Sequence, residues 1–301
     1  MYLRAFGLRR LPFESTSNAS IYVDLPNHRD AFNTILFGLR SGEGFLKVVG
    51  EVGTGKTALC RALLAELDSG SIPVYLPNPA LGPNDLLHAI ADELGVPVAS
   101  GTPFARVQRY VREVLLDVAR DGGRAVVFVD EAQTMPDEAL ESLRLLGNLE
   151  SNLGRLVQVV FFGQPEFDGR LRSYGLRPLQ QRIAFSARLE PLDRRACREY
   201  VLRRLDAAGS ARAHQTFTPA AIDRIHRASG GIPRLINLLC HKSLIATFCE
   251  GELQVGRRHV ARAVDESEGL RRWQTRPLWR GRRFRDRTRS DLAASVPAGA
   301  P

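Results

Sequence analysis

The first two-thirds of the chain alternate between short apolar runs and stretches with helical spacing. Five runs have the length and the aliphatic and aromatic content of buried strands, and they cover residues 45–49, 74–76, 125–129, 156–162 and 183–189. Between the second and third runs, apolar side chains recur every three or four positions, at Val107, Val111, Val114, Leu115 and Val118. A helix that covers one side of a sheet has this spacing. The pattern predicts an α/β fold with a parallel sheet flanked by helices.

After Pro191 the strand signals stop and helical spacing takes over, beginning with the stripe Cys197, Tyr200, Val201, Leu205 and Ala208. A small all-helical domain is expected there. From about residue 271 the chain is rich in Arg, Pro, Ser, Ala and Gly without apolar periodicity, which is typical of a disordered tail. The sequence therefore predicts three parts, which are an α/β core at residues 1–191, a small helical domain at 192–270 and a basic tail at 271–301.

The composition is that of an ordinary globular protein, with 44% apolar and 25% charged residues among 301. The four cysteines are widely scattered without a C-x-x-C pair, which favours neither a zinc ribbon nor a disulfide framework. The N-terminus lacks the apolar core of a signal peptide, and no window approaches the roughly 18 apolar residues that span a bilayer. We expect a cytoplasmic protein or one held peripherally at a membrane.

The formal charge of +9 lies mainly in the tail. From Arg271 onward there are nine arginines against two aspartates, whereas the first 270 residues carry 33 basic and 31 acidic side chains. The folded part is therefore nearly neutral, which weakens a nucleic-acid hypothesis based on charge alone. Trp273, Trp279 and Phe284 lie among these arginines, so the tail suits either a solvated terminus or a peripheral contact with an anionic membrane surface.

A phosphate-binding loop follows the first strand. The spacing Gly-x-x-x-x-Gly-Lys-Thr opens a helical stretch, as this motif requires. Glycines allow backbone N–H groups to face the phosphates, Lys56 adds a compact positive charge, and the Thr57 hydroxyl is a ligand for Mg²⁺. The predicted nucleotide-binding residues are Gly50, Glu51, Val52, Gly53, Thr54, Gly55, Lys56, Thr57 and Ala58.

Two carboxylates end the strand at residues 125–129. Asp130 is predicted to hold Mg²⁺ together with Thr57, and Glu131 to orient and deprotonate the attacking water. Acidic residues end many strands, so the pair is informative mainly because it follows a phosphate-binding loop at a suitable distance.

Two arginines are further candidates. Arg234 follows Gly230-Gly231-Ile232-Pro233 at the predicted start of a helix, where a cation opposes the helix dipole unless an anion shares the site, so we expect it to contact phosphate. Arg182 precedes the last strand and is the candidate for an arginine finger that acts on a neighbouring subunit. Arg177 is its competitor, and an ordinary surface role is the alternative for both.

Four motifs together resemble the ExeA-like branch of the AAA+ ATPases: the phosphate loop, Asp130-Glu131-Ala132-Gln133, Phe162-Gly163-Gln164-Pro165-Glu166 and Gly230-Gly231-Ile232-Pro233-Arg234. The resemblance extends over residues 1–268. It implies a five-stranded AAA+ core with a helical lid, ATP and Mg²⁺ as cofactors, and Gln164 as the sensor 1 residue. The other interpretation of Gln164 is a turn residue at a strand end. Similarity to the family also suggests an adenine-side lining at Pro12-Phe13, Tyr22 and His28-Arg29, where the aromatics suit a core equally well.

Two departures from the family limit what the resemblance implies. Relatives often carry Leu-Arg-Gln-Leu-Arg-Gln-Arg-Ile where this chain has Leu-Arg-Pro-Leu-Gln-Gln-Arg-Ile at residues 176–183, which weakens the assignment of the finger. Longer ExeA-like proteins continue into a membrane span and a peptidoglycan-binding domain. The sequence shows neither, so direct contact with the cell wall is not expected.

The leading hypothesis is an ATPase, active as a ring or dimer of identical chains, that assists assembly of a type IV, MSHA-like pilus or a type II secretion-like machine at the inner membrane. The pilus or secretion partners are implied by resemblance alone. One alternative is a DNA-associated AAA+ protein of the TniB-like transposition type, with the tail contacting phosphates. Another is a nucleotide-dependent scaffold or switch.

Overall fold

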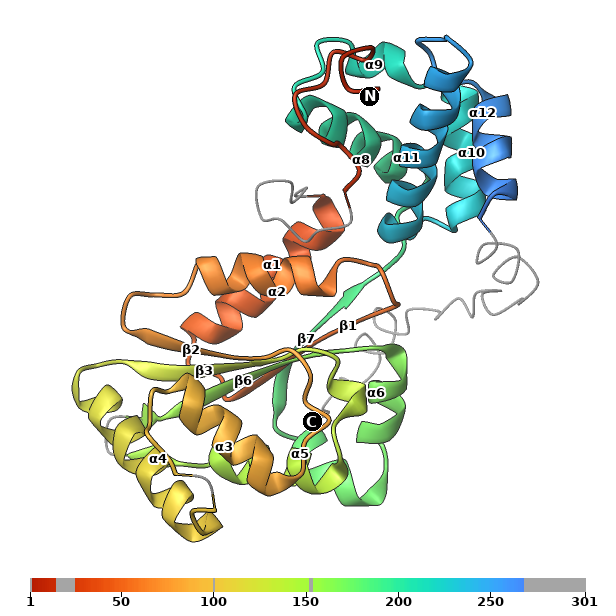
Figure 1. Cartoon of the computed structure of the whole chain (residues 1–301). Helices are drawn as coiled ribbons and strands as arrows, with labels where there is room; N and C mark the ends of the chain where they lie inside the picture. Colours follow the sequence, from red (N-terminus) through yellow and green to blue (C-terminus); the bar gives the residue numbers. More distant parts are fainter. Residues whose placement is uncertain (1, 15–24, 100, 152–153, 268–301) are drawn as a thin grey trace, which may run out of the picture.

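A five-stranded parallel sheet forms the centre of the larger part of the molecule (Figure 1). The computed structural model describes residues 2–14, 25–99, 101–151 and 154–267. The strands lie in the order β2-β3-β6-β1-β7, and each neighbouring pair is parallel. Their bounds are β1 Phe45–Gly50, β2 Ser71–Leu76, β3 Arg124–Val129, β6 Val157–Gly163 and β7 Ile183–Leu189. The predicted α/β fold with five parallel strands is confirmed. Strand β2 begins three residues earlier than its apolar run, because the exposed start of this edge strand needs no apolar side chains.

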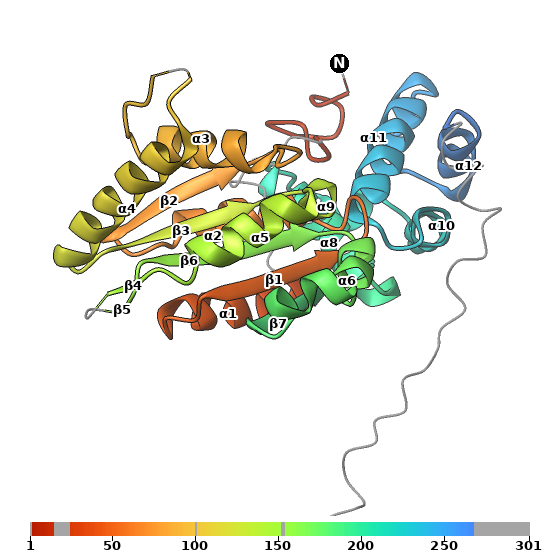
Figure 2. The ribbon, with the colours of Figure 1, turned by 90° about the horizontal axis from the view of Figure 1, so that it is seen from below.

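Helices cover both faces of the sheet (Figures 1 and 2). Alternate residues of β3 supply the two faces, with Val127 and Val129 in one apolar cluster and Val126 and Phe128 in the other. The first cluster lies under α3 Pro83–Glu93, α4 Phe104–Arg120, α5 Asp137–Leu146, α6 Pro165–Leu171 and α7 Arg177–Gln180. The second lies under α1 Pro26–Arg40 and α2 Lys56–Ala65. Short 3-10 helices, η2 Ala132–Thr134 and η3 Tyr174–Leu176, and the hairpin β4 Glu150–Ser151 with β5 Gly154–Arg155, complete this part.

The strand register brings the carboxyl ends of β1, β3 and β6 together. Val49 of β1 lies opposite Gly163 of β6, and Val129 of β3 lies opposite Phe161. Residues that follow these three strands therefore meet at one edge of the sheet, where ligands bind in open α/β folds.

The chain after β7 is helical and has its own apolar core. Its helices are α8 Arg194–Ala207, α9 Ala213–Thr216, α10 Pro219–Ser229, α11 Pro233–Cys249 and α12 Arg257–Asp265. The N-terminal residues pack into this core, which the predicted 1–191 unit did not anticipate. Phe13 lies edge-on to Phe217, the Tyr2 hydroxyl is 3.0 Å from His241 Nδ1, and the buried Arg204 donates to the Pro12 carbonyl at 2.7 Å. The boundary between core and lid otherwise stays a prediction.

Within residues 2–14, 25–99, 101–151 and 154–267, no helix has the length and apolar content to cross a membrane. The arginine-rich tail proposed for membrane or nucleic-acid contact lies outside these ranges.

Candidate functional site

The phosphate-binding loop connects β1 to α2 at the carboxyl edge of the sheet. Strand β1 ends at Gly50 and α2 begins at Lys56. No side chain caps the N-terminus of α2, so backbone N–H groups of its first turn remain donors for an anion. The predicted loop thus has the strand-to-helix geometry in which phosphates are bound.

Gly53 must be a glycine for two separate reasons. Its φ is 83°, in the left-handed region that side chains disfavour. A Cβ atom there would also lie 2.7 Å from Cβ of Arg234. The close approach brings the start of α11 directly onto the loop, and the Arg234 N–H donates to the Gly53 carbonyl at 3.2 Å.

Lys56 is only 5% exposed and lies among carbonyls and carboxylates. Its Nζ donates to the carbonyl oxygens of Gly50 at 2.7 Å and Glu51 at 3.1 Å. Burial lowers the pKa of Lys56, and nearby negative charges oppose this shift, that of Glu131 most strongly, followed by Asp130, Glu51 and Glu166. A buried ammonium group of this kind favours a multiply charged anion beside it.

Thr57 and Asp130 form a pair of oxygen ligands. The Thr57 hydroxyl donates to Asp130 Oδ2 at 2.8 Å, and the Glu131 N–H donates to Asp130 Oδ1 at 2.9 Å. Burial, followed by the nearby charge of Asp130, raises the pKa of Tyr75 to about 12. A hydroxyl beside a carboxylate is the hard oxygen set that Mg²⁺ prefers, so these residues fit the predicted metal.

Glu131 lies between two glutamine amides. Its Oε2 accepts from Gln133 Nε2 at 2.5 Å and from Gln164 Nε2 at 3.1 Å. The Gln164 N–H in turn donates to Gln133 Oε1 at 3.0 Å. Sequence reasoning predicted Glu131 and Gln164 but assigned no role to Gln133. Its only signal was its position two residues after Glu131 in the same motif.

Arg234 lies in the first turn of α11, on the phosphate loop, as described above. The preceding Gly231 has a φ of 77°, and a Cβ there would lie 2.1 Å from the Leu192 carbonyl oxygen, so this turn fits tightly against the segment after β7. The Gly231 carbonyl also accepts from the Leu192 N–H at 2.8 Å. The Arg234 side chain is exposed and close enough to the loop for a bound phosphate to reach it.

Arg182 and Arg177 lie away from this edge. Arg182 directly precedes β7, which runs parallel to β1, so it lies at the opposite edge of the sheet, roughly 20 Å away at the usual rise per strand residue. It lines a cavity of about 480 Å³ together with Glu43, Arg155 and Gln181. Arg177 lies over the Tyr174 ring at 5.5 Å. At that distance Arg182 cannot reach the phosphate loop of its own chain.

The proposed adenine lining is only partly beside the loop. Phe13 is buried in the helical core, as the alternative interpretation expected, and Tyr22 lies outside the described residues. His28 is buried, and its Nε2 lies 2.9 Å from the Thr54 carbonyl oxygen. Because a carbonyl can only accept, Nε2 carries the proton and donates to the loop.

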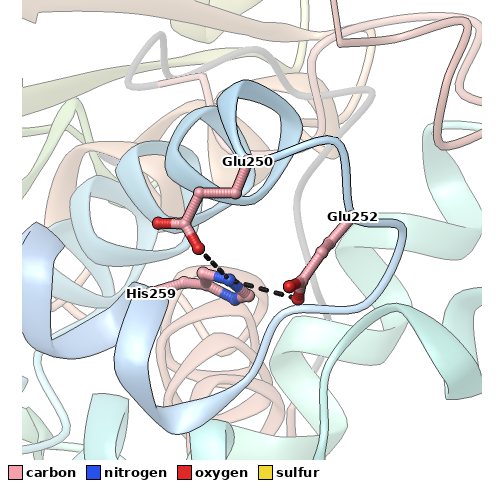
Figure 3. Close-up of side chains that lie close together, drawn as sticks. All are labelled: Glu250, Glu252 and His259. Atoms are coloured by element: carbon pink, nitrogen blue, oxygen red, sulfur yellow. Dashed lines mark hydrogen bonds and ion pairs between the residues drawn. The ribbon is translucent and has the colours of Figure 1, made fainter.

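A second group of titratable side chains lies between α11 and α12 (Figure 3). Nε2 of His259, which is 1% exposed, is 3.1 Å from Glu250 Oε2 and 3.4 Å from Glu252 Oε2. The Gly256 N–H donates to His259 Nδ1 at 2.9 Å. Arg258 contacts both carboxylates, and its Nε lies 3.2 Å from His259 Nε2, so a cationic side chain already lies among these groups. This geometry favours a cap at the start of α12 over a metal site.

Comparison with known proteins found a matching family model and related proteins. Residues 39–171 match the AAA domain family model. The chain is 41% identical to general secretion pathway protein A of Aeromonas hydrophila over 278 residues, which is 91% of this chain and 50% of that protein. It thus spans about half of that relative's length.

Solved structures with a similar fold include two from archaeal proteins. Cdc6p from Pyrobaculum aerophilum has a TM-score of 0.69 at 19% identity, and the match covers 85% of this chain and 70% of the Cdc6p chain. ORC2 from Aeropyrum pernix, solved with ADPNP and ADP, has a TM-score of 0.65 at 17% identity. This match covers 86% of this chain and 72% of the ORC2 chain. At such identities the similarity concerns the fold alone.

Proposed function

We propose that this chain is a P-loop AAA+ ATPase that hydrolyses ATP with Mg²⁺. Its match to the AAA domain family model and its similarity to general secretion pathway protein A support this proposal. The observation that carries the proposal is the grouping at the carboxyl edge of the sheet. The phosphate-binding loop there contributes Lys56 and Thr57, Thr57 is paired with Asp130, and the Glu131–Gln164 pair follows the neighbouring strands. Phosphoryl transfer needs such a grouping, because its catalysis is mainly positioning and charge stabilisation.

Each residue has a role that its contacts support. The loop N–H groups and Lys56 would bind the β- and γ-phosphates, and Thr57 and Asp130 would hold Mg²⁺, which neutralises charge on the phosphates. Glu131 would accept a proton from the attacking water, and Gln164 would orient that water or contact the γ-phosphate. Arg234, from the first turn of α11, would contact phosphate and so link the helical lid to the bound nucleotide.

An oligomer completes this site. Arg182 is exposed at the opposite edge of the sheet, so it can act only on the nucleotide of another subunit. We assign the arginine finger to Arg182 ahead of Arg177, because the Arg177 guanidinium already lies over the Tyr174 ring.

The cellular role we propose is assembly of a type IV pilus or a type II secretion-like machine at the inner membrane. It is supported by the relationship to general secretion pathway protein A and, more finely, by sequence resemblance to the MSHA pilus biogenesis ATPase MshM. Replacing the native gene with a Glu131→Gln copy should reduce surface pilin or a secreted substrate. Unchanged levels of both would contradict this role.

The biochemical test is phosphate release by purified protein with ATP, with and without Mg²⁺, over a range of protein concentrations. We expect turnover that requires Mg²⁺ and falls by about 100-fold or more in Glu131→Gln, because the proton acceptor is lost. Glu138→Gln, at an exposed position of α5, is the matched control and should be unaffected. Turnover in the native chain no higher than in Glu131→Gln at every concentration would contradict the proposal.

A further inference from the structure

Gln133 occupies a bridging position in the site that no predicted role explains. It lies in η2, between β3 and α5, and is half-buried. Its side-chain amide contacts the Glu131 carboxylate on one side and the end of β6 on the other, through the Gln164 N–H. One side chain therefore joins the ends of two neighbouring strands.

The orientation of this amide follows from its partners. The Gln164 N–H can only donate, so the oxygen of the Gln133 amide must face it. The NH₂ group then faces Glu131, at 2.5 Å from Oε2. An exchanged assignment would place the NH₂ group against a donor and the oxygen against a carboxylate, which is unfavourable on both sides.

The backbone of this segment is held from outside the network. Arg170 of α6 donates from Nη1 to the Gln133 carbonyl at 2.8 Å and also contacts the Asp137 carboxylate. These bonds hold η2 against α6, so the backbone position from which the Gln133 side chain extends is fixed.

Glu131 needs such support, because its backbone is in an unfavourable conformation. Its φ is 51°, and it is the only residue other than glycine with a positive φ in the described part of the chain. Such a conformation persists only where the surroundings hold it.

We propose that Gln133 is a positioning residue that holds the Glu131 carboxylate toward the terminal phosphate of the nucleotide and couples it to Gln164. The inference rests on the proposed ATP hydrolysis. Because Gln133 bonds to both residues, a shift of Gln164 against the γ-phosphate would be passed directly to the group that accepts the proton from water.

The test compares two substitutions in the full chain. Gln133→Ala removes both bonds, and we expect kcat to fall by about 10- to 100-fold while the Kd for ATP stays within about twofold. Gln133→Glu keeps an acceptor for the Gln164 N–H but removes the donor to Glu131 and adds a second negative charge, so its loss should be at least as large. Gln108→Ala, at an exposed glutamine of α4, is the control.

A double substitution separates positioning from an independent contribution. If Gln133 acts through Glu131, Glu131→Gln combined with Gln133→Ala should be no slower than Glu131→Gln alone. Additive losses, or a Gln133→Glu variant as active as the native chain, would overturn the proposal. Because the Kd for ATP is measured in every variant, a misfolded protein would be recognised by its failure to bind ATP. If the native chain itself shows no turnover, it is the proposed function that fails.

Discussion

At the carboxyl edge of the sheet the functional side chains already bond to one another, whereas the predicted finger at the amino edge does not. Lys56, Thr57, Asp130, Glu131 and Gln164 all have hydrogen-bond partners within the chain. The Arg182 side chain is exposed and lines a cavity, and its charge helps to lower the pKa of Glu141. The first arrangement is preorganised for chemistry within one chain, and the second is suited to an anion brought by another molecule.

The largest effect is expected from a test of whether Arg182 acts on another chain. The variants Lys56→Ala and Arg182→Ala are assayed separately and then as a mixture. Each change alone should lower turnover by about 1,000-fold, because phosphate binding or transition-state charge stabilisation is lost. Mixed in equal amounts, they should recover part of the activity, since one supplies an intact finger and the other an intact phosphate loop. Phosphate release at a concentration where the native chain is oligomeric is the measurement.

Arg177→Ala is the matched control. If Arg177 is not the finger, this variant should keep its own turnover, and mixing it with Lys56→Ala should give no further recovery. If the mixture of Lys56→Ala with Arg177→Ala recovers activity but the mixture with Arg182→Ala does not, the arginine finger is Arg177. Absence of recovery in both mixtures would contradict a finger that acts on a neighbouring subunit.

A smaller effect is expected at the junction of loop and lid. Arg234→Ala should lower kcat/KM by about tenfold, because one charge-assisted contact with phosphate is lost while the loop itself is unchanged. Arg257→Ala is a suitable control, since Arg257 also lies in the first turn of a helix, α12, but away from the loop. Equal kinetics for both variants would mean that the side chain at residue 234 is merely solvated.

The smallest effect should appear far from either edge, in the lid. His259→Ala leaves the Gly256 N–H and two carboxylates without their buried partner, so we expect a loss of about 1–3 kcal/mol in the free energy of unfolding. Turnover below the melting temperature should be unchanged. Denaturation followed by circular dichroism, with and without added Zn²⁺, measures this, and a Zn²⁺-dependent rise in the melting temperature of the native chain would contradict the cap.

Both glutamines of the Glu131 network show where prediction from the sequence stopped. Gln164 was found because it ends a strand in a familiar motif. Gln133 was passed over, because four residues after the end of β3 its side chain has no periodic partner, and only the turn of η2 brings it back onto Glu131. The packing of residues 2–14 against the helical domain was not foreseen for a similar reason, since their apolar side chains follow no period that indicates which surface they contact.

The sequence by itself determined the alternation of strands and helices, the phosphate loop with its strand and helix, and the carboxylates after β3, because these depend on local spacing and on residue type. Only the tertiary structure decided which strand ends meet, that Arg234 lies on the loop, and that Arg182 lies at the far edge of the sheet. Such relations depend on strand order and on the packing of segments more than 100 residues apart, which local patterns do not contain.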